Sequence, residues 1–278
     1  MQKTFLQRLA HTSQSHHSLL CVGLDPDLTQ LPSTVRADTD PVYAFCTRII
    51  EATADLVCAF KPNIAFFEAL GTTGFETLQR VIQTIPNHIP VILDAKRGDI
   101  DSTAKAYAHA IFDILGVHAV TLNPYLGSDA LEPFLQYQDR GCILLCKTSN
   151  PGSADIQDKR LEDGRPLYLE VARQARDTWN TYNNVGLVVG ATYPAIIQEV
   201  RDVCPDLPFL IPGVGMQGGN LTATVQAAVT SHHQHAVINV SRSILYASAE
   251  DNFAEVARNK ALYFRNAIND ALVGVKSE

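Results

Sequence analysis

Short apolar segments recur along the chain, and each interval between them leaves room for a helix. Eight segments are rich in Val, Ile, Leu and Cys and do not alternate with polar residues: 19–24, 56–60, 90–93, 119–122, 142–146, 185–189, 209–211 and 236–240. Continuous apolar runs of this length are typical of strands that are buried on both faces, as in a parallel sheet. The pattern therefore predicts eight parallel strands.

Segments with the spacing of amphipathic helices fill the intervals. Clear examples are 41–54, 101–116 and 165–179, and the segment 250–272 closes the chain. Strands and helices in this alternation predict an α/β fold, a (β/α)₈ TIM barrel that spans 1–278 as a single domain, with 1–18 as an N-terminal helical extension. A doubly wound sheet would use fewer strands, and no G-x-G-x-x-G follows the first strand.

Composition and charge exclude several classes of protein. An apolar fraction of 46% with 18% charged residues excludes a disordered chain, and no run approaches the roughly 18 apolar residues of a membrane span. The net charge of −7, with no basic stripe, argues against a nucleic-acid partner. The first residues lack the apolar region of a secretory signal, and the six cysteines lack zinc-site spacing. We therefore expect a cytoplasmic protein with reduced, buried thiols.

Charged and small polar residues follow the predicted strands directly. Examples are Asp25, Lys61, Ser149 and Arg242, together with the stretch 94–99. In a barrel the carboxyl ends of all strands meet at one mouth, where the active sites of barrel enzymes lie. Loops are polar in any case, which explains isolated residues but not lysines placed beside carboxylates at strand ends. The pattern favours a site at the mouth.

The stretch DAKRGD at 94–99 is the most informative part of the sequence. Asp94 and Lys96 are two residues apart in a strand and therefore point to the same face. Gly98 permits a turn that brings Asp99 near the start of the next helix, although Asp99 or Asp101 could simply cap that helix. A lysine held between carboxylates stays protonated. Such a lysine is suited to donating a proton and not to the Schiff-base chemistry of an aldolase.

The last two predicted strands are followed by features of a phosphate site. The glycine-rich run IPGVGMQGGN follows the seventh strand, and Ser241-Arg242-Ser243 follows the eighth. Barrels often bind phosphate with these two loops, and a guanidinium can hold a phosphate through two hydrogen bonds. The sequence thus predicts a phosphorylated substrate, with the glycine-rich loop as a lid.

These motifs together resemble one enzyme family. DAKRGDIDSTA is similar to the D-x-K-x-x-D-I-x-x-T signature of the orotidine 5′-phosphate decarboxylases. KPNIAFFEALG, KTSNPGS, PGVGMQGG and SRS also resemble that family, in its longer bacterial branch. The resemblance extends from Asp25 to about Arg242 and so covers most of the chain.

The resemblance implies decarboxylation of orotidine 5′-monophosphate (OMP) to uridine 5′-monophosphate (UMP) and CO₂, the last step of UMP biosynthesis, without a cofactor or metal. Lys96 would be the general acid that protonates C6 of the pyrimidine. Asp94 would face the substrate carboxylate, and Lys61 would join the charged array. In the family the second Asp of the motif comes from the neighbouring subunit. Asp99 and Thr103 would therefore complete the partner's site in a homodimer.

The resemblance also implies which residues hold the rest of the substrate. Asp25 and Lys61 match positions that bind the ribose, Ser149 would read the pyrimidine edge and Pro212 would pack against the base. Gln217, Ser241 and Arg242 would hold the phosphate. The full substrate-binding set that the resemblance implies is Asp25, Ile100, Thr103, Ser149, Pro212, Gln217, Ser241 and Arg242.

Two other functions stay open on the residues alone. A metal-dependent sugar-phosphate lyase or synthase can carry the same D-x-K-x-x-D core, with its carboxylates on Mg²⁺. A catalytically silent barrel would bind phosphorylated ligands without turnover. The histidines before the first and last strands are expected at the face opposite the mouth, as solvated loop residues and not as metal ligands. Phe66, Phe67 and Glu68 could line either the site or the dimer interface.

Overall fold

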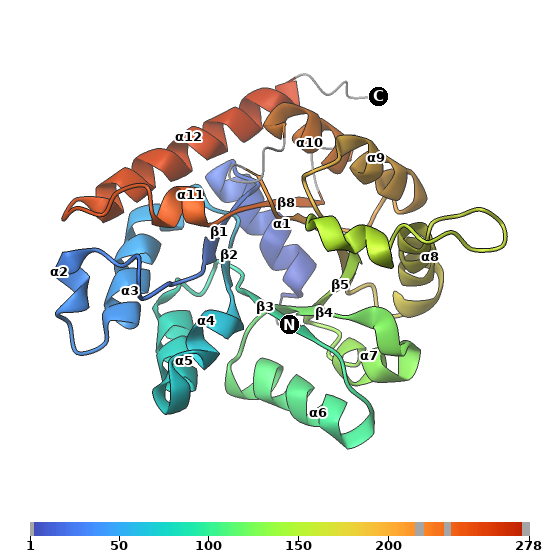
Figure 1. Cartoon of the computed structure of the whole chain (residues 1–278), viewed down its shortest axis with the longest axis horizontal. Coiled ribbons are helices and arrows are strands. Elements are labelled where there is room, and N and C mark those ends of the chain that lie inside the picture. Colours follow the sequence, from blue (N-terminus) through green and yellow to red (C-terminus); the bar gives the residue numbers. More distant parts are fainter. Residues whose placement is uncertain (1–2, 215–219, 231–234, 274–278) are drawn as a thin grey trace.

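The continuous apolar runs form the strands of a barrel. The computed structural model describes residues 3–214, 220–230 and 235–273. Its eight parallel strands have the order β2-β1-β8-β7-β6-β5-β4-β3, and isolated parallel bridges from Phe60 to Val91 and from Asn63 to Asp94 join β2 to β3. The predicted (β/α)₈ barrel is confirmed (Figure 1). The strands are β1 Leu20–Leu24, β2 Ala59–Pro62, β3 Ile92–Arg97, β4 Ala119–Leu122, β5 Gly141–Lys147, β6 Val185–Val189, β7 Phe209–Ile211 and β8 Ala236–Val240.

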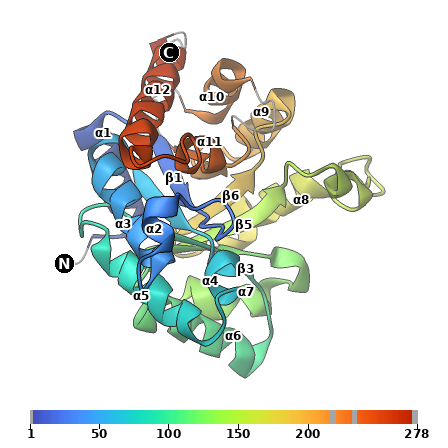
Figure 2. The same cartoon turned by 60° about the vertical axis from the view of Figure 1, so that its left-hand side comes forward.

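Helices surround the strands (Figures 1 and 2). The α-helices are α1 Phe5–His16, α2 Ser33–Arg36, α3 Pro41–Thr53, α4 Ile64–Glu68, α5 Gly74–Thr84, α6 Asp101–His109, α7 Ser128–Leu135, α8 Leu167–Gln174, α9 Pro194–Val203, α10 Leu221–Ala228, α11 Arg242–Leu245 and α12 Phe253–Val273. Helices α6 and α8 each continue into a wider π turn, η3 Ala110–Ile114 and η6 Ala175–Trp179. Short 3₁₀ turns occupy η1 Ala54–Leu56, η2 Gly71–Thr73, η4 Pro124–Leu126 and η5 Pro151–Asp155.

Two strands differ from their predicted ranges for different reasons. The run 56–60 was expected as a strand, but Leu56 ends the 3₁₀ turn η1 and β2 starts only at Ala59. The strand predicted over 90–93 ends too early, because β3 continues to Arg97. Its last residues are polar since they belong to the mouth of the barrel, so apolarity ends before the strand does.

The N-terminal extension closes one end of the barrel. Helix α1 crosses the middle of the barrel in Figure 1. Phe5 and Leu9 of this helix are buried in a cluster with residues from the barrel interior, including Cys21, Ile92 and Val237. The ring of Phe5 takes the space beside Gly141, where a Cβ would lie 2.4 Å from it. Since these contacts lie at the amino-terminal ends of the strands, the opposite end is left for the site.

The structure also bears on the cysteines and on the possibility of a membrane-spanning helix. All six cysteines are buried with free thiols. Burial raises their pKa values, that of Cys204 to about 11 and that of Cys58 to about 12, so both stay protonated near neutral pH. Among the helices of the described residues, none is both long and apolar enough to cross a membrane.

Candidate active site

Three charged side chains meet at the carboxyl ends of β2 and β3. The carboxylate of Asp94 accepts a hydrogen bond from Lys61 Nζ at 2.8 Å on Oδ2 and one from Lys96 Nζ at 2.5 Å on Oδ1. The side chain of Lys61 is only 4% exposed, whereas that of Lys96 is 49% exposed and faces the open mouth. The predicted array of Lys61, Asp94 and Lys96 is therefore present as a geometric unit.

The array keeps its charges. Burial alone would raise the pKa of the Asp94 carboxyl, but the ammonium groups of Lys61 and Lys96 hold it well below its usual range. Burial would likewise lower the pKa of Lys61, and attraction to Asp94 and Asp25 reverses that effect and raises it. Asp94 is thus an anion and Lys61 a cation at any physiological pH.

The backbone at Lys96 departs from regular strand geometry. Its φ is +47°, in the left-handed region, and the pairing of β3 with β4 shifts between Leu93 and Arg97. Thr121 of β4 fills the irregularity, because its Oγ1 accepts from the backbone N–H groups of Ala95 and Lys96 and donates to Asp94 Oδ1 at 3.1 Å. A non-glycine residue with positive φ costs about 1 kcal/mol. The hydroxyl of Thr121 holds this conformation in place.

Two adjoining cavities open beside the array. The larger, of about 480 Å³, is lined by Lys96 and by the segment that follows Ser149. The smaller, of about 170 Å³, is lined by Asp25, Ser241 and Arg242. Both share four residues at their junction. These are Lys61, Asp94, Ser149 and Pro212.

The smaller cavity has the features of a polar ligand site. Asp25 Oδ1 and Asn239 Oδ1 are buried there, and neither has a hydrogen-bond partner within the described part of the chain. Ser241 packs so closely on β1 that a Cβ at Gly23 would lie 1.9 Å from its Oγ. Arg242 is the first residue of α11 and lines the same cavity. Buried acceptors beside a guanidinium suit a ligand that carries both hydroxyl and anionic groups.

Three of the predicted site residues that the structure describes do not line these cavities. Asp99, Ile100 and Thr103 lie at the start of α6, where Ile100 is 51% exposed. The Asp99 carboxylate accepts from the backbone N–H of Ile100 at 2.8 Å. Among the residues that the structure describes, no side chain caps α6, so neither Asp99 nor Asp101 has the alternative capping role. Gln217 lies outside the described residues.

Several residues of the site were not predicted from the sequence. Thr121 was hidden in an apolar strand, where a single inward-facing hydroxyl is a weak signal. Asn239 stands in the last apolar run in the same way. One wall of the larger cavity is formed by residues that follow Ser149, to which the sequence assigned no role because they have no clear equivalents in the motifs of the family. Its cavity-lining residues are Asn150, Gly152, Ser153, Ile156 and Gln157.

Of the three residues whose role was left open, Phe66 is half-buried and does not line either cavity. Phe67 is fully buried in the core. Glu68 binds Arg97 through its Oε1 at 2.6 Å from Nη2, and neither residue lines the two cavities. At the end of the barrel opposite the mouth, His17 is exposed after the end of α1, as expected. His16 is instead the last residue of α1, half-buried, with its Nδ1 2.8 Å from the carbonyl oxygen of Val57, so it is not a solvated loop residue. Throughout the described ranges, no three or more His, Cys, Asp or Glu side chains form a group that could hold a metal ion.

Comparison with known proteins identifies the family. A model described as "Orotidine 5'-phosphate decarboxylase / HUMPS family" matches residues 18–258, which is most of the chain. The chain belongs to this family. A relative from Roseiflexus sp. (strain RS-1), named orotidine 5′-phosphate decarboxylase, is 58% identical over 270 residues, covering 97% of this chain and 99% of the relative. A relative of the same name from Paracidovorax citrulli is 51% identical over 272 residues, covering 96% and 99%.

Solved structures of the orotidine 5′-phosphate decarboxylase family agree with the fold. The OMP decarboxylase of Leishmania donovani is 42% identical, with a TM-score of 0.86, and the match covers 98% of this chain and all of that one. The UMP synthase of the same organism is 44% identical with a TM-score of 0.85, and the match covers 96% of this chain but 57% of that one. The suspected resemblance is confirmed, and the chain is a member of an enzyme family.

Proposed function

We propose that this protein decarboxylates OMP to UMP and CO₂ as the last step of UMP biosynthesis, with no cofactor. The observation that carries the proposal is the array of Lys61, Asp94 and Lys96, which places one anion between two cations beside a cavity. This arrangement supplies fixed charge beside the cavity, which stabilises a developing carbanion without an electron sink. Membership in the family supports the choice of substrate.

Lys96 is the proposed general acid. As the bond between C6 and the carboxylate carbon breaks, CO₂ leaves and the electron pair stays on C6. Lys96 Nζ then donates a proton to C6, and the bond that forms is the C6–H bond of UMP. Because the Lys96 side chain is 49% exposed, the neutral amine can regain a proton from solvent. Each turnover thus releases one CO₂ and takes up one proton from solvent, and no oxidant, reductant or other reactant is needed.

Asp94 and Lys61 are proposed to prepare the site for this step. Asp94 is held as an anion by the two lysines, and it would face the carboxylate of the substrate. Two like charges at close range favour the state in which one of them has left as neutral CO₂. Lys61, fixed and buried behind Asp94, keeps the array in place and would also bind the ribose. The catalysis is thus electrostatic.

The two cavities support a division of the substrate into base, ribose and phosphate. We assign the base to the larger cavity, against Pro212 and with its edge at Ser149, and the ribose to Asp25 and Lys61 at the junction. The phosphate belongs to the smaller cavity, held by Arg242 and by the backbone N–H of Ser241. Gln217 completes the phosphate contacts in the proposal. Phosphate binding would supply energy that is used at the ring.

A homodimer is the proposed assembly, in the cytoplasm. Asp99, Ile100 and Thr103 lie outside the cavities of their own chain, and Ile100 is exposed although it is apolar. This supports a role for Asp99 and Thr103 in the site of a neighbouring subunit.

The test is an absorbance assay with purified protein and OMP, with and without EDTA. The proposal predicts loss of the OMP absorbance at the same rate in both samples. Turnover that EDTA abolishes would favour the metal-dependent sugar-phosphate chemistry of related barrels and contradict the proposal. Binding of UMP without any turnover of OMP would identify a silent binding barrel instead.

A further inference from the structure

The wall that follows Ser149 stands apart from the barrel. Residues 150–157 line the larger cavity on one side and are largely exposed on the other. In Figure 2 the chain between β5 and α8 projects away from the strands. A segment with few buried apolar contacts is held by its polar contacts. The structure shows what these contacts are.

Lys147 anchors the wall from inside the barrel. It is the last residue of β5, and its side chain is 3% exposed. Its Nζ donates to Asp158 Oδ1 at 2.6 Å and to Ser153 Oγ at 3.0 Å, and it lies 5.8 Å from the centre of the Tyr168 ring. A buried ammonium costs several kcal/mol unless it is paired. The ion pair therefore holds Ser153 and Asp158 over the end of β5.

Gln157 anchors the same wall to the residue before Ser149. Its Oε1 accepts from the backbone N–H of Thr148 at 2.9 Å, and its Nε2 donates to Thr148 Oγ1 at 3.0 Å. Ser149 itself fits closely against β6, since a Cβ at Gly190 would lie 2.7 Å from its backbone nitrogen. The orientation of Ser149 thus depends on the wall as well as on the strand.

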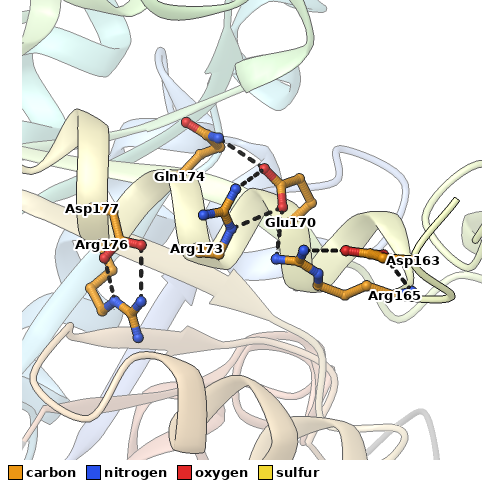
Figure 3. Close-up of polar contacts among 7 residues, drawn as sticks. All are labelled: Asp163, Arg165, Glu170, Arg173, Gln174, Arg176 and Asp177. Carbon is orange, nitrogen blue, oxygen red and sulfur yellow. Dashed lines mark hydrogen bonds and ion pairs between the residues drawn. The ribbon is translucent and has the colours of Figure 1, made fainter. Parts of the chain in front are cut away.

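The far end of the segment is tied to α8 (Figure 3). Arg165 pairs with Asp163 and donates to Glu170 Oε2 at 3.1 Å. Glu170 is held in turn by Arg173 and Gln174 of α8. Exposed ion pairs contribute little singly, but this network joins the outer loop to a helix. The segment is thus fixed at both ends, and Ser153, which Lys147 binds, lines the larger cavity, whereas Arg165 and Glu170 do not.

We propose that Lys147 is a positioning residue for the base subsite. Its buried ion pair holds the wall against Ser149, so that the larger cavity keeps the shape that orients the base of a bound nucleotide. The identity of that ligand rests on the proposed function. The smaller cavity shares Ser149 with the larger one but includes neither Lys147 nor any residue of the wall, so a sugar phosphate without a base makes no contact with the wall itself.

The test compares two ligands on two matched variants by calorimetry. Lys147→Met removes the ammonium and keeps the length of the side chain, and Lys159→Met makes the same change at an exposed position of the same segment. In Lys147→Met the Kd of UMP should rise about tenfold or more, because small displacements of a binding group carry large costs. The Kd of ribose 5-phosphate should stay within about twofold, as should both values in Lys159→Met.

Three outcomes overturn the proposal: an unchanged Kd for UMP in Lys147→Met, an equal loss for both ligands, or a wild-type protein that binds UMP no better than ribose 5-phosphate. If Lys147→Met does not fold, Gln157→Leu breaks the second anchor and should give the same selective loss; a uniform loss or none would contradict the role of the wall. Failure of the proposed function would give a different result: the wild type would bind UMP but would not turn over OMP.

Discussion

A single carboxylate organises the chemistry at the scale of residues. Asp94 binds two ammonium groups, and their charges keep its pKa low although it is largely buried. A buried charge with partners on both oxygens is fixed in position, which is what electrostatic catalysis requires. Under the proposed mechanism, we expect the residues that hold Asp94 and Lys96 in place to affect the rate more than substrate binding.

Thr121→Val tests this positioning. The change keeps the shape of a side chain that is 1% exposed but removes the hydroxyl that joins Asp94 to the backbone of Ala95 and Lys96. We expect kcat to fall about tenfold with little change in KM, as a lost hydrogen bond is worth about 1 kcal/mol or more. Steady-state kinetics with OMP measure both constants. A change in KM alone would mean that Thr121 acts on binding.

Arg242→Ala tests the phosphate assignment. The guanidinium lines the smaller cavity, away from Lys96. Its loss should raise KM about 10- to 100-fold, since a hydrogen bond to a charged group contributes about 1.5–3 kcal/mol, and kcat at saturation should change less. Arg160→Ala, at an exposed position outside the cavities, is the control. An unchanged KM would contradict the assignment of the phosphate to the smaller cavity.

The sequence predicted the charged residues of the site better than the residues that support them. Asp94 and Lys96 stand two apart at a strand end, and this spacing alone indicated that they meet. Thr121 and Lys147 act through contacts across strands and with a distant loop. Such contacts leave no periodic signal, so only the folded chain reveals them.

At the scale of elements, apolar runs located the strands closely. The runs 119–122, 185–189, 209–211 and 236–240 coincide with β4, β6, β7 and β8. The strand whose end was predicted least accurately is β3, whose last residues include Asp94 and Lys96, the proposed catalytic residues. The role of α1 as a plug was also not predicted, because its contacts with the barrel interior are long-range. The apolar pattern of the sequence locates an element, but its role depends on the residues it packs against in the fold.

The plugged end of the barrel predicts a pH dependence of stability. His118 precedes β4, and its Nδ1 accepts from the backbone N–H of Val91 at 3.1 Å. Burial, aided by the charges of Arg8 and Arg140, lowers its pKa to about 4. The pKa of this histidine in the unfolded chain is about 6.5. Between pH 6.5 and pH 4, the unfolded chain therefore binds a proton at this histidine that the folded chain does not bind. Stability from this group is therefore present above pH 6.5 and is lost as the pH falls toward 4.

His118→Gln removes this titration. Urea unfolding at pH 7 and at pH 5 should show that the variant loses about 1–2 kcal/mol less stability than the wild type over this interval. The comparison of the two differences cancels the contribution of other groups. An equal loss in both proteins would mean that His118 titrates normally in the folded state.

At the scale of the whole molecule, net charge is a poor guide to the ligand. The chain carries a net charge of −7, yet the proposed substrate is an anion. The positive charge that matters is local, at Lys61, Lys96 and Arg242 around the two cavities. The start of α6 lies outside these cavities, and that is where the dimer proposal can be tested.

Mixing two inactive variants tests the shared site. Lys96→Ala and Asp99→Ala should each be inactive alone, but a hybrid dimer would contain one site with both residues intact. After subunit exchange in an equal mixture, about a quarter of the wild-type activity should return. Exchange is verified by mass spectrometry of tagged subunits. No recovery after verified exchange would place Asp99 in the site of its own chain or outside catalysis.

The rate of OMP decarboxylation by Lys96→Ala tests the proposed chemistry most directly. Lys96 is half-exposed, so the substitution leaves no buried charge unpaired, and Lys61 still neutralises Asp94. If Lys96 is the general acid, kcat falls by more than about a thousandfold while UMP still binds. Near-normal turnover in the purified Lys96→Ala variant would contradict the assignment.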